Sequence, residues 1–260
     1  MLPFPLRLTA DLTISRLAQK SRSAQGARSV QYLDAAEVLH HDSNHPVSLE
    51  RIHEINSSGS PVVWIGGSEP LYHPGISHLV RAITQTGHFV FLETDGTLLR
   101  RRIHEFQPAS QLFLTIRLEP GTRRCASKGL RADALELAVE GIRAARLSGF
   151  LICLHMRVLA ETDLGEMAAL IQYARSLDVD GIVITPASSK ANSANPDHAV
   201  LQQKTSEARK LIGSKWWESF SRLLEPVLSD DRRSVRSAEE KFSVPREQEA
   251  HANEEGMRVA

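Results

Sequence analysis

The sequence predicts an α/β fold built on a parallel sheet, and two observations carry that prediction. Short apolar segments rich in β-branched residues alternate along the chain with longer segments whose apolar residues recur at helical spacing. Five strand-like segments follow one another between Pro61 and Ser189, with a helical segment between each pair. Strands that alternate with helices form a parallel sheet with helical crossovers, so either an open sheet or a barrel is expected.

The elements are expected in a regular order. A helix is predicted over residues 5–23, a first strand over 29–34 and a helix over 47–59. The five alternating strands are expected at residues 61–67, 88–96, 111–121, 150–159 and 180–189. The helices between them are expected at residues 76–87, 97–106, 131–149 and 162–178, and Gly149 is typical of a helix C-terminus.

The C-terminal part of the chain divides into a helical stretch and a charged stretch. Residues 205–228 are predicted to be helical, with Trp216 and Trp217 packing against the open side of the sheet. From Ser229 the chain is charged and poor in apolar residues, which predicts disorder. We therefore expect a folded core over residues 1–228 and a disordered tail over 229–260.

The composition excludes several classes of partner. The 260 residues include 31 basic and 31 acidic side chains, so the formal charge is zero and gives no reason to expect nucleic acid as a partner. No apolar run approaches the roughly 20 residues that a membrane-spanning helix needs. The N-terminal sequence MLPFPLRLTADL lacks the long apolar region of a secretory signal, so a cytoplasmic location is expected.

The cysteine content excludes a thiolate-rich site. The chain has two cysteines, Cys125 and Cys153, and neither belongs to a C-x-x-C or similar metal-binding spacing. A disulfide framework is therefore excluded, as is a zinc or iron–sulfur site held by several cysteines of this chain. No metal site is predicted.

Candidate binding residues fall at the ends of two predicted strands, where ligands bind in parallel α/β folds. Glycines at a strand end let the backbone approach a ligand closely, and a carboxylate such as that of Glu69 can bind an ammonium group. On the local pattern alone, a glycine turn followed by an acid at a helix start is the simpler interpretation. The candidates are Gly66, Gly67, Ser68, Glu69, Pro70, Thr94, Asp95 and Gly96.

The same two strand ends resemble motifs of the radical SAM enzymes. WIGGSEPLYHPGISHLVRAI is similar to their Gly-Gly-Glu-Pro region, and LETDGTLL resembles their Thr-Asn-Gly signature, with Asp95 in the Asn position. The segment from Ala145 to Pro186 resembles the later helix–strand–helix–strand of that family. The segments PLR…LAQKSR, LLRRRIHEFQP and WWESFSRLLEPVL resemble its hopanoid-biosynthesis group, which attaches a 5′-deoxyadenosyl unit to a hopene. The resemblance implies a partial (βα)6 barrel with an N-terminal helix and a C-terminal helical extension.

The resemblance also implies two cofactors, and the sequence is compatible with only one of them. The glycine backbone and Glu69 would hold the amino group of S-adenosylmethionine (SAM). Three cysteines of a C-x3-C-x2-C loop after the first strand would hold a [4Fe–4S] cluster, but the corresponding segment, DAAEVLHHDSNHPVSLE, has no cysteine. His40, His41 and His45 lie there, and a solvated polar loop is a simpler interpretation than a three-histidine iron site. No cluster is expected from this chain.

Three residues are candidates for catalytic acid–base or pocket-lining roles. His155 and Arg157 alternate with apolar residues in their strand, which predicts that both point into the barrel interior. Glu119 stands at the end of the preceding strand, where the related enzymes carry an Asp before a Gly.

Three functional hypotheses follow, and they leave open whether the chain is an enzyme. The favoured one is a degenerate radical SAM protein without its own cluster. It would act as a binding or partner subunit, paired with an intact homologous subunit, and keep a residual SAM or nucleoside pocket. The second is an active radical SAM enzyme of the hopanoid type whose cluster ligands are unrecognised or come from another chain. The third is a cluster-free enzyme that uses His155, Glu119 or Glu69 in acid–base roles.

Overall fold

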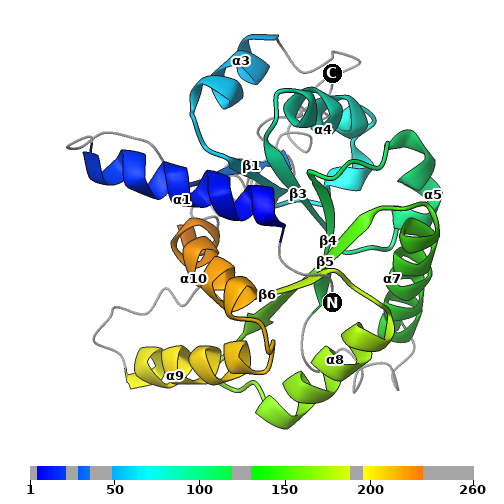
Figure 1. Cartoon of the computed structure of the whole chain (residues 1–260). Coiled ribbons are helices and arrows are strands. Elements are labelled where there is room, and N and C mark those ends of the chain that lie inside the picture. The colour runs from blue at the N-terminus through cyan, green and yellow to red at the C-terminus, as the bar shows by residue number, and fades with distance from the viewer. Residues whose placement is uncertain (1–4, 22–28, 36–48, 119–129, 188–195, 231–260) are drawn as a thin grey trace, which may run out of the picture.

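The computed structural model describes residues 5–21, 29–35, 49–118, 130–187 and 196–230, which form six parallel strands surrounded by helices (Figure 1). Consecutive strands pair with each other in the order β1-β2-β3-β4-β5-β6. The sheet curls into a half-barrel, so the predicted partial barrel is confirmed. The strands are β1 (Val30–Asp34), β2 (Val62–Gly66), β3 (Phe89–Thr94), β4 (Leu112–Leu118), β5 (Leu151–Val158) and β6 (Gly181–Pro186).

The crossover helices surround the outer face of this sheet in Figure 1. They are α3 (Leu49–Ser57), α4 (Ile76–Gln85), α5 (Leu99–Arg102), α7 (Leu130–Leu147) and α8 (Leu164–Ser176), with the short 3-10 helices η1 (Pro70–Tyr72) and η2 (Ile103–Glu105). Every residue of β2, β3 and β6 is buried, because the helices cover one face of these strands and the barrel interior covers the other. Strands buried on both faces have continuous apolar sequences, which is why the sequence alone revealed them.

Three helices complete the fold outside the crossovers. They are α1 (Leu6–Ser21), α9 (Pro196–Lys210) and α10 (Lys215–Asp230). In α1 the guanidinium of Arg7 lies 5.9 Å from the ring centroid of Phe89, the first residue of β3, so α1 reaches the amino ends of the strands. Helix α10 contacts both edge strands, β6 and β1, and thereby closes the open side of the half-barrel.

An aromatic layer links the sheet interior to α10. The rings of Trp64 and Phe91 are stacked with centroids 5.4 Å apart, and those of Phe91 and Phe113 are stacked at 4.7 Å. Phe220 of α10 lies 5.1 Å from Phe91, and Trp217 lies 6.1 Å from Phe113. Aromatic side chains therefore fill the barrel interior next to α10. The polar residues lie toward the carboxyl ends of the strands.

Edge strand β6 is protected by side chains of α9 and α10. The backbone N–H of Ile184 donates to the hydroxyl of Ser221 at 3.0 Å, and Nε of Arg209 donates to the carbonyl of Ile184 at 2.9 Å. The guanidinium of Arg209 is in turn held by Glu225 at 2.9 Å. Side chains thus satisfy two backbone groups that would otherwise be open to another strand.

The C-terminal region differs in part from the prediction. The single helix expected over residues 205–228 is two helices, because the chain turns at Gly213, whose φ of +66° favours glycine. Trp217 is buried, as predicted, but Trp216 is 56% exposed, so its predicted packing against the sheet is wrong. Helix α10 extends to Asp230, and the tail beyond it lies outside the described residues.

One further property concerns membranes. Within the described part of the chain, no helix combines the length and the apolar content that crossing a bilayer requires.

Candidate functional site

Glu69 connects the two strand-end loops that the sequence singles out. Its Oε1 accepts hydrogen bonds from the backbone N–H of Leu71 at 3.1 Å and from the hydroxyl of Thr94 at 2.6 Å. Its Oε2 accepts one from the backbone N–H of Asp95 at 2.8 Å. Because β2 and β3 are parallel neighbours, the loops that follow them meet at one edge of the sheet, and this carboxylate ties them together.

The environment of Glu69 changes its acidity. Burial raises the pKa of this carboxyl above its usual 4.5, while the hydrogen bonds from Thr94, Asp95 and Leu71 oppose the rise. A carboxylate offers about four acceptor positions, and three are used by the protein. Glu69 can therefore accept one more hydrogen bond, for example from a ligand ammonium group.

The glycines before Glu69 make room for two acids. A Cβ on Gly66 would lie 2.7 Å from Oε2 of Glu93, and a Cβ on Gly67 would lie 2.7 Å from the carboxyl group of Asp34. Gly67 also has a φ of +84°, which L side chains rarely adopt. The two glycines are thus required by close packing inside the chain. The structure supports the simpler interpretation of this turn, in which no ligand is needed to explain them.

The other predicted residues of these loops have local roles. Ser68 is exposed, and Pro70 is buried as the first residue of η1. Gly96 has a φ of +82°, and a Cβ there would lie 3.0 Å from the Cβ of Ala138 in α7. Among the candidates, Glu69, Thr94 and Asp95 are brought into direct contact.

A chain of buried hydrogen bonds crosses the barrel interior next to this edge. Oε1 of Glu93 in β3 lies 2.8 Å from Nδ1 of His155 in β5, and Nε2 of His155 lies 2.8 Å from the hydroxyl of Thr185 in β6. Trp64 donates its indole N–H to Oε2 of Glu93 at 3.0 Å. Glu93, His155 and Thr185 are 6%, 2% and 1% exposed. A carboxylate, an imidazole and a hydroxyl are thus aligned in one continuous chain.

The hydrogen bonds and charges around Glu93 keep its carboxyl ionised. Burial on its own raises its pKa, but the charge and hydrogen bond of His155, the charge of Arg117 and the Trp64 hydrogen bond outweigh it and lower the pKa from 4.5 to about 2. Glu93 therefore acts as a fixed negative charge that orients the imidazole through Nδ1.

Charge is distributed unevenly around the carboxyl ends of the strands. Arg117 of β4 has its Nη1 atom 3.9 Å from Oε1 of Glu93, and Arg157 is the register partner of Thr185. Acids therefore gather at β1 to β3 and basic groups at β4 and β5. The acids are Asp34, Glu69, Glu93 and Asp95; the basic groups are Arg117, His155 and Arg157.

The sequence located this site only in part. His155 belongs to the buried chain of hydrogen bonds, in agreement with its predicted inward orientation. Arg157 is the register partner of Thr185 in the pairing of β5 with β6. Glu119 lies outside the described residues. Sequence reasoning missed Glu93, although a single acid in the apolar segment FVFLET, two residues after Phe91 and so on the same face, was a usable signal.

The described residues do not form a cluster site. Cys153 is fully buried in β5, where burial and the charges of Asp180 and Glu93 raise the pKa of its thiol well above 9.0. Across the described ranges, no group of three or more His, Cys, Asp or Glu side chains is arranged to hold a metal. Cys125 and the segment with His40, His41 and His45 lie outside those ranges.

Comparison with protein families gives one match. Residues 47–174 match the family described as the Radical SAM superfamily. The match begins after β1 and within the last four residues of the segment in which the cysteine loop was expected, DAAEVLHHDSNHPVSLE.

Individual proteins are similar to this chain in sequence or in fold. GTP 3′,8-cyclase 2 from Pseudomonas aeruginosa is 27% identical over 199 residues, which are 73% of this chain and 57% of the cyclase. SuiB from Streptococcus suis superimposes with a TM-score of 0.52 at 12% identity, over 80% of this chain and 52% of SuiB. A SuiB structure with S-adenosylmethionine bound gives a TM-score of 0.49 at 11% identity, over 78% of this chain and 49% of SuiB. The chain thus spans about half the length of the proteins that it matches.

Proposed function

From the match of residues 47–174 to the Radical SAM superfamily, we propose that the chain is a non-radical module that binds SAM or a related nucleoside. Its role would be that of a binding or partner subunit beside an intact homologous subunit. The observation that carries the proposal is the cysteine content: the chain has two cysteines, and the superfamily's cluster loop needs three.

The residues present do not fit a [4Fe–4S] cluster. Iron–sulfur clusters are held by thiolates, and Cys153 is fully buried inside a strand with its thiol pKa raised. That leaves Cys125 as the one remaining thiol of the chain. No radical step can therefore be assigned to this chain's own residues.

The residues present do fit the amino-acid end of SAM. Glu69 keeps one acceptor position for an ammonium group, next to the backbone of Gly66 and Gly67. Arg117 of β4 and Arg157 of β5 carry guanidinium groups on the strands that follow the acid-bearing ones, and a guanidinium complements a carboxylate. An edge with acids on one side and cations on the other suits a zwitterion. Bound SAM would supply a sulfonium group.

The curated relative favours a nucleoside as the class of ligand. That relative is named a GTP cyclase, and GTP and SAM each contain a purine nucleoside. It is not a hopanoid-biosynthesis enzyme, so the hopanoid subgroup stays a prediction that rests on the N-terminal and C-terminal segments. Because the chain spans 57% of the cyclase, we propose the ligand class and not the cyclase reaction.

Calorimetry tests the binding proposal. SAM and adenosine are titrated into the wild type, the Glu69→Gln variant and the Glu140→Gln variant, whose substitution lies on the exposed face of α7. We expect Glu69→Gln to weaken SAM binding about tenfold, because a charge-assisted hydrogen bond is lost. Adenosine has no amino-acid end, so its affinity should not change. If neither compound binds at millimolar concentration, the proposed pocket is wrong and only the fold resembles the family.

Anaerobic reconstitution tests the cluster proposal. The purified chain, incubated with iron and sulfide, should stay colourless and release no 5′-deoxyadenosine from SAM under reductant. Binding of about four irons per chain together with SAM cleavage would establish the active-enzyme hypothesis instead. Substituting His40, His41 and His45 in turn would then show whether histidines replace the thiolates.

A second candidate function is supported by the buried hydrogen-bond chain. Glu93, His155 and Thr185 have the carboxylate–imidazole–hydroxyl order that activates a hydroxyl in acid–base catalysis. The chain would then be a cluster-free enzyme acting on the bound nucleoside. Release of free base from nucleosides by the wild type, and its loss in His155→Asn, would support this function. Equal release by both proteins would contradict it.

A further inference from the structure

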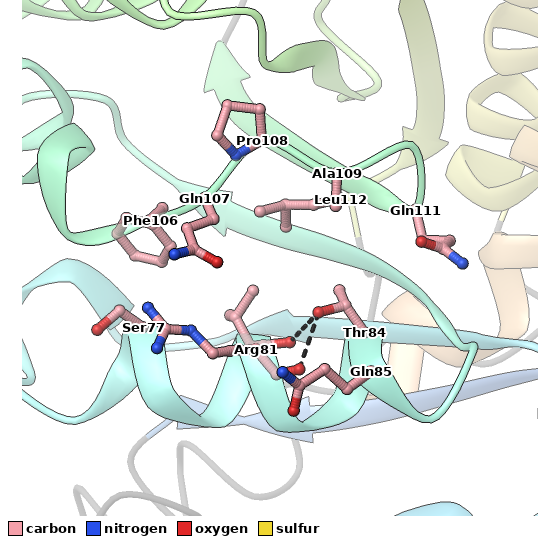
Figure 2. A pocket seen from close by; sticks show the side chains of 11 residues that line it. Ser77, Arg81, Thr84, Gln85, Phe106, Gln107, Pro108, Ala109, Gln111 and Leu112 are labelled. Atoms are coloured by element: carbon pink, nitrogen blue, oxygen red, sulfur yellow. Dashed lines mark hydrogen bonds between the residues drawn. The ribbon is translucent and has the colours of Figure 1, made fainter.

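A groove on the outer face of the barrel lies away from the strand-end site. It has a volume of about 250 Å³ and lies between α4 and the segment 106–112, which leads into the amino end of β4 (Figure 2). The site described above lies at the carboxyl ends of the strands, so the two are separate. A volume of this size corresponds to roughly eight water molecules at about 30 Å³ each, which is enough for a small molecule or one residue of a peptide.

The floor and one wall of the groove are apolar. Val80, Phe106 and Leu112 are 2%, 6% and 2% exposed, and each has part of its side chain at the groove surface. Pro108 and Ala109 continue this surface along the upper side in Figure 2. An apolar group of a ligand can displace water from these side chains, which favours binding.

Polar groups of α4 and the opposite segment converge on this apolar surface. Arg81 of α4 and Gln107 of the opposite segment face each other across the groove in Figure 2. Among the described residues, the guanidinium of Arg81 takes part in no ion pair or side-chain hydrogen bond. It is therefore free to bind an anion.

Ser77 adds a hydroxyl to the polar groups that line the groove. It lines the groove one helical turn before Arg81 and is only 8% exposed. Within the part of the chain that the structure describes, its hydroxyl has no hydrogen-bond partner. Solvent reaches this hydroxyl, so it is available to donate a hydrogen bond to a ligand oxygen at the groove surface.

We propose that this groove binds a carboxylate carried on a small apolar group. One guanidinium matches the single charge of a carboxylate and can bind it through two parallel hydrogen bonds. Ser77 and Gln107 add neutral donors, and the apolar floor receives the rest of the ligand. The carboxylate can belong to a free acid or to the C-terminal residue of a peptide, and these two sources share the same chemistry. The inference does not depend on the strand-end site.

Nuclear magnetic resonance of the ¹⁵N-labelled full chain provides the test. The probes are N-acetyl-leucine, its amide, and a short peptide ending in leucine with either a free or an amidated C-terminus. We expect N-acetyl-leucine to produce saturable shifts in the backbone amides of α4 and of residues 106–112. Its amide should bind at least about tenfold more weakly, because the charge-assisted hydrogen bonds are lost. If the peptide with a free C-terminus binds as well, the site accepts chain termini; if only the free acid binds, the site is for small molecules.

Matched substitutions complete the test. Arg81→Met removes the charge but keeps an unbranched side chain with similar helix propensity, and should weaken binding of the acid about tenfold or more. Arg143→Met, on the exposed face of α7, makes the same chemical change elsewhere and should leave the affinity unchanged. Ser77→Ala should weaken binding by a smaller factor. The proposal is wrong if the acid and the peptide give no saturable shifts, if the amide binds as tightly as the acid, or if Arg81→Met binds like the wild type.

Discussion

The indole ring of Trp217 occupies the space that a side chain at Gly181 would need. A Cβ on Gly181 would lie 2.2 Å from two of its ring carbons, which is far inside van der Waals contact. Gly181 is the first residue of β6, and Trp217 is a fully buried residue of α10. The contact fixes how closely α10 approaches the sheet.

Gly181→Ala should therefore destabilise the protein strongly. Forcing a methyl group into this contact must move the indole ring, at a cost of about 1–3 kcal/mol or more in the free energy of unfolding. Denaturant unfolding measures this cost, and the same substitution in a Trp217→Leu background is the control. The cost should shrink there, because the ring is gone. An equal cost in both backgrounds would mean that the ring is not the obstacle.

Glu93→Gln should destabilise the protein at neutral pH by about 1–3 kcal/mol. The amide cannot serve as the fixed negative charge beside His155, although it can keep one hydrogen bond. In the wild type the folded-state pKa of Glu93 is about 2, below the ordinary 4.5. Its stabilisation is complete above 4.5 and is lost as the pH falls toward 2.

Unfolding free energies measured between pH 5 and about pH 2 check this prediction. The wild-type curve should fall more steeply with acid than that of Glu93→Gln. Parallel curves for the two proteins would show that the carboxyl is not held ionised.

Thr94→Val should raise the pKa of Glu69 further. Burial raises this pKa above 4.5, and the hydrogen bond from Thr94 is the largest factor that opposes the rise. Carbon-13 titration of the Glu69 carboxyl should give a higher midpoint in the variant. Thr97→Val is the control, because the Thr97 hydroxyl donates to Asp95 and not to Glu69. A similar midpoint in Thr94→Val and the wild type would contradict the contact.

The raised pKa of Glu69 also determines how this carboxyl changes the stability of the protein with pH. A carboxyl whose folded-state pKa lies above 4.5 binds its proton more tightly in the folded state than in the unfolded chain. Its contribution to stability is therefore greatest below pH 4.5 and declines as the pH rises through the folded-state pKa. The contribution of Glu93 to stability changes with pH in the opposite direction.

Cys153 should be unreactive toward thiol reagents in the native protein. Its side chain is fully buried and burial raises the pKa of its thiol, so thiolate is scarce and inaccessible. In a Cys125→Ser variant, Ellman's reagent should react only after guanidinium unfolds the chain. Rapid modification of the native variant would show that β5 opens, or that its interior is accessible.

The sheet was predictable because its strands have continuous apolar sequences that end at glycines or polar residues. The sequence PVVWIGG illustrates this, since all five residues of β2 are buried and Gly66 ends the strand. The region after residue 196 was harder. Helical spacing continues through the LIGSKWW segment, and only the positive φ of Gly213 separates α9 from α10.

The site was predictable only where its residues are close in sequence. Glu69 and the loop after β3 were found because unusual residues follow apolar strands. The contact between Glu93 and His155 joins residues 62 positions apart, and the contact from His155 to Thr185 joins residues 30 positions apart. Such contacts depend on the register of β3, β5 and β6, which residue patterns along a single strand do not determine.

The hydrogen bonds of Ser221 and Arg209 to Ile184 have a consequence for how the molecule behaves in concentrated solution. With α9 and α10 in place, Arg209 binds the carbonyl of Ile184 and Ser221 binds its amide, so neither group is free to pair with a strand of a neighbouring molecule. A fragment that ends at Gly213 keeps all six strands but loses Ser221, Trp217 and the cover over this edge. Such a fragment would leave the amide of Ile184 without its partner on an apolar edge strand, which favours aggregation, so α10 contributes to the solubility of the half-barrel as well as to its closure.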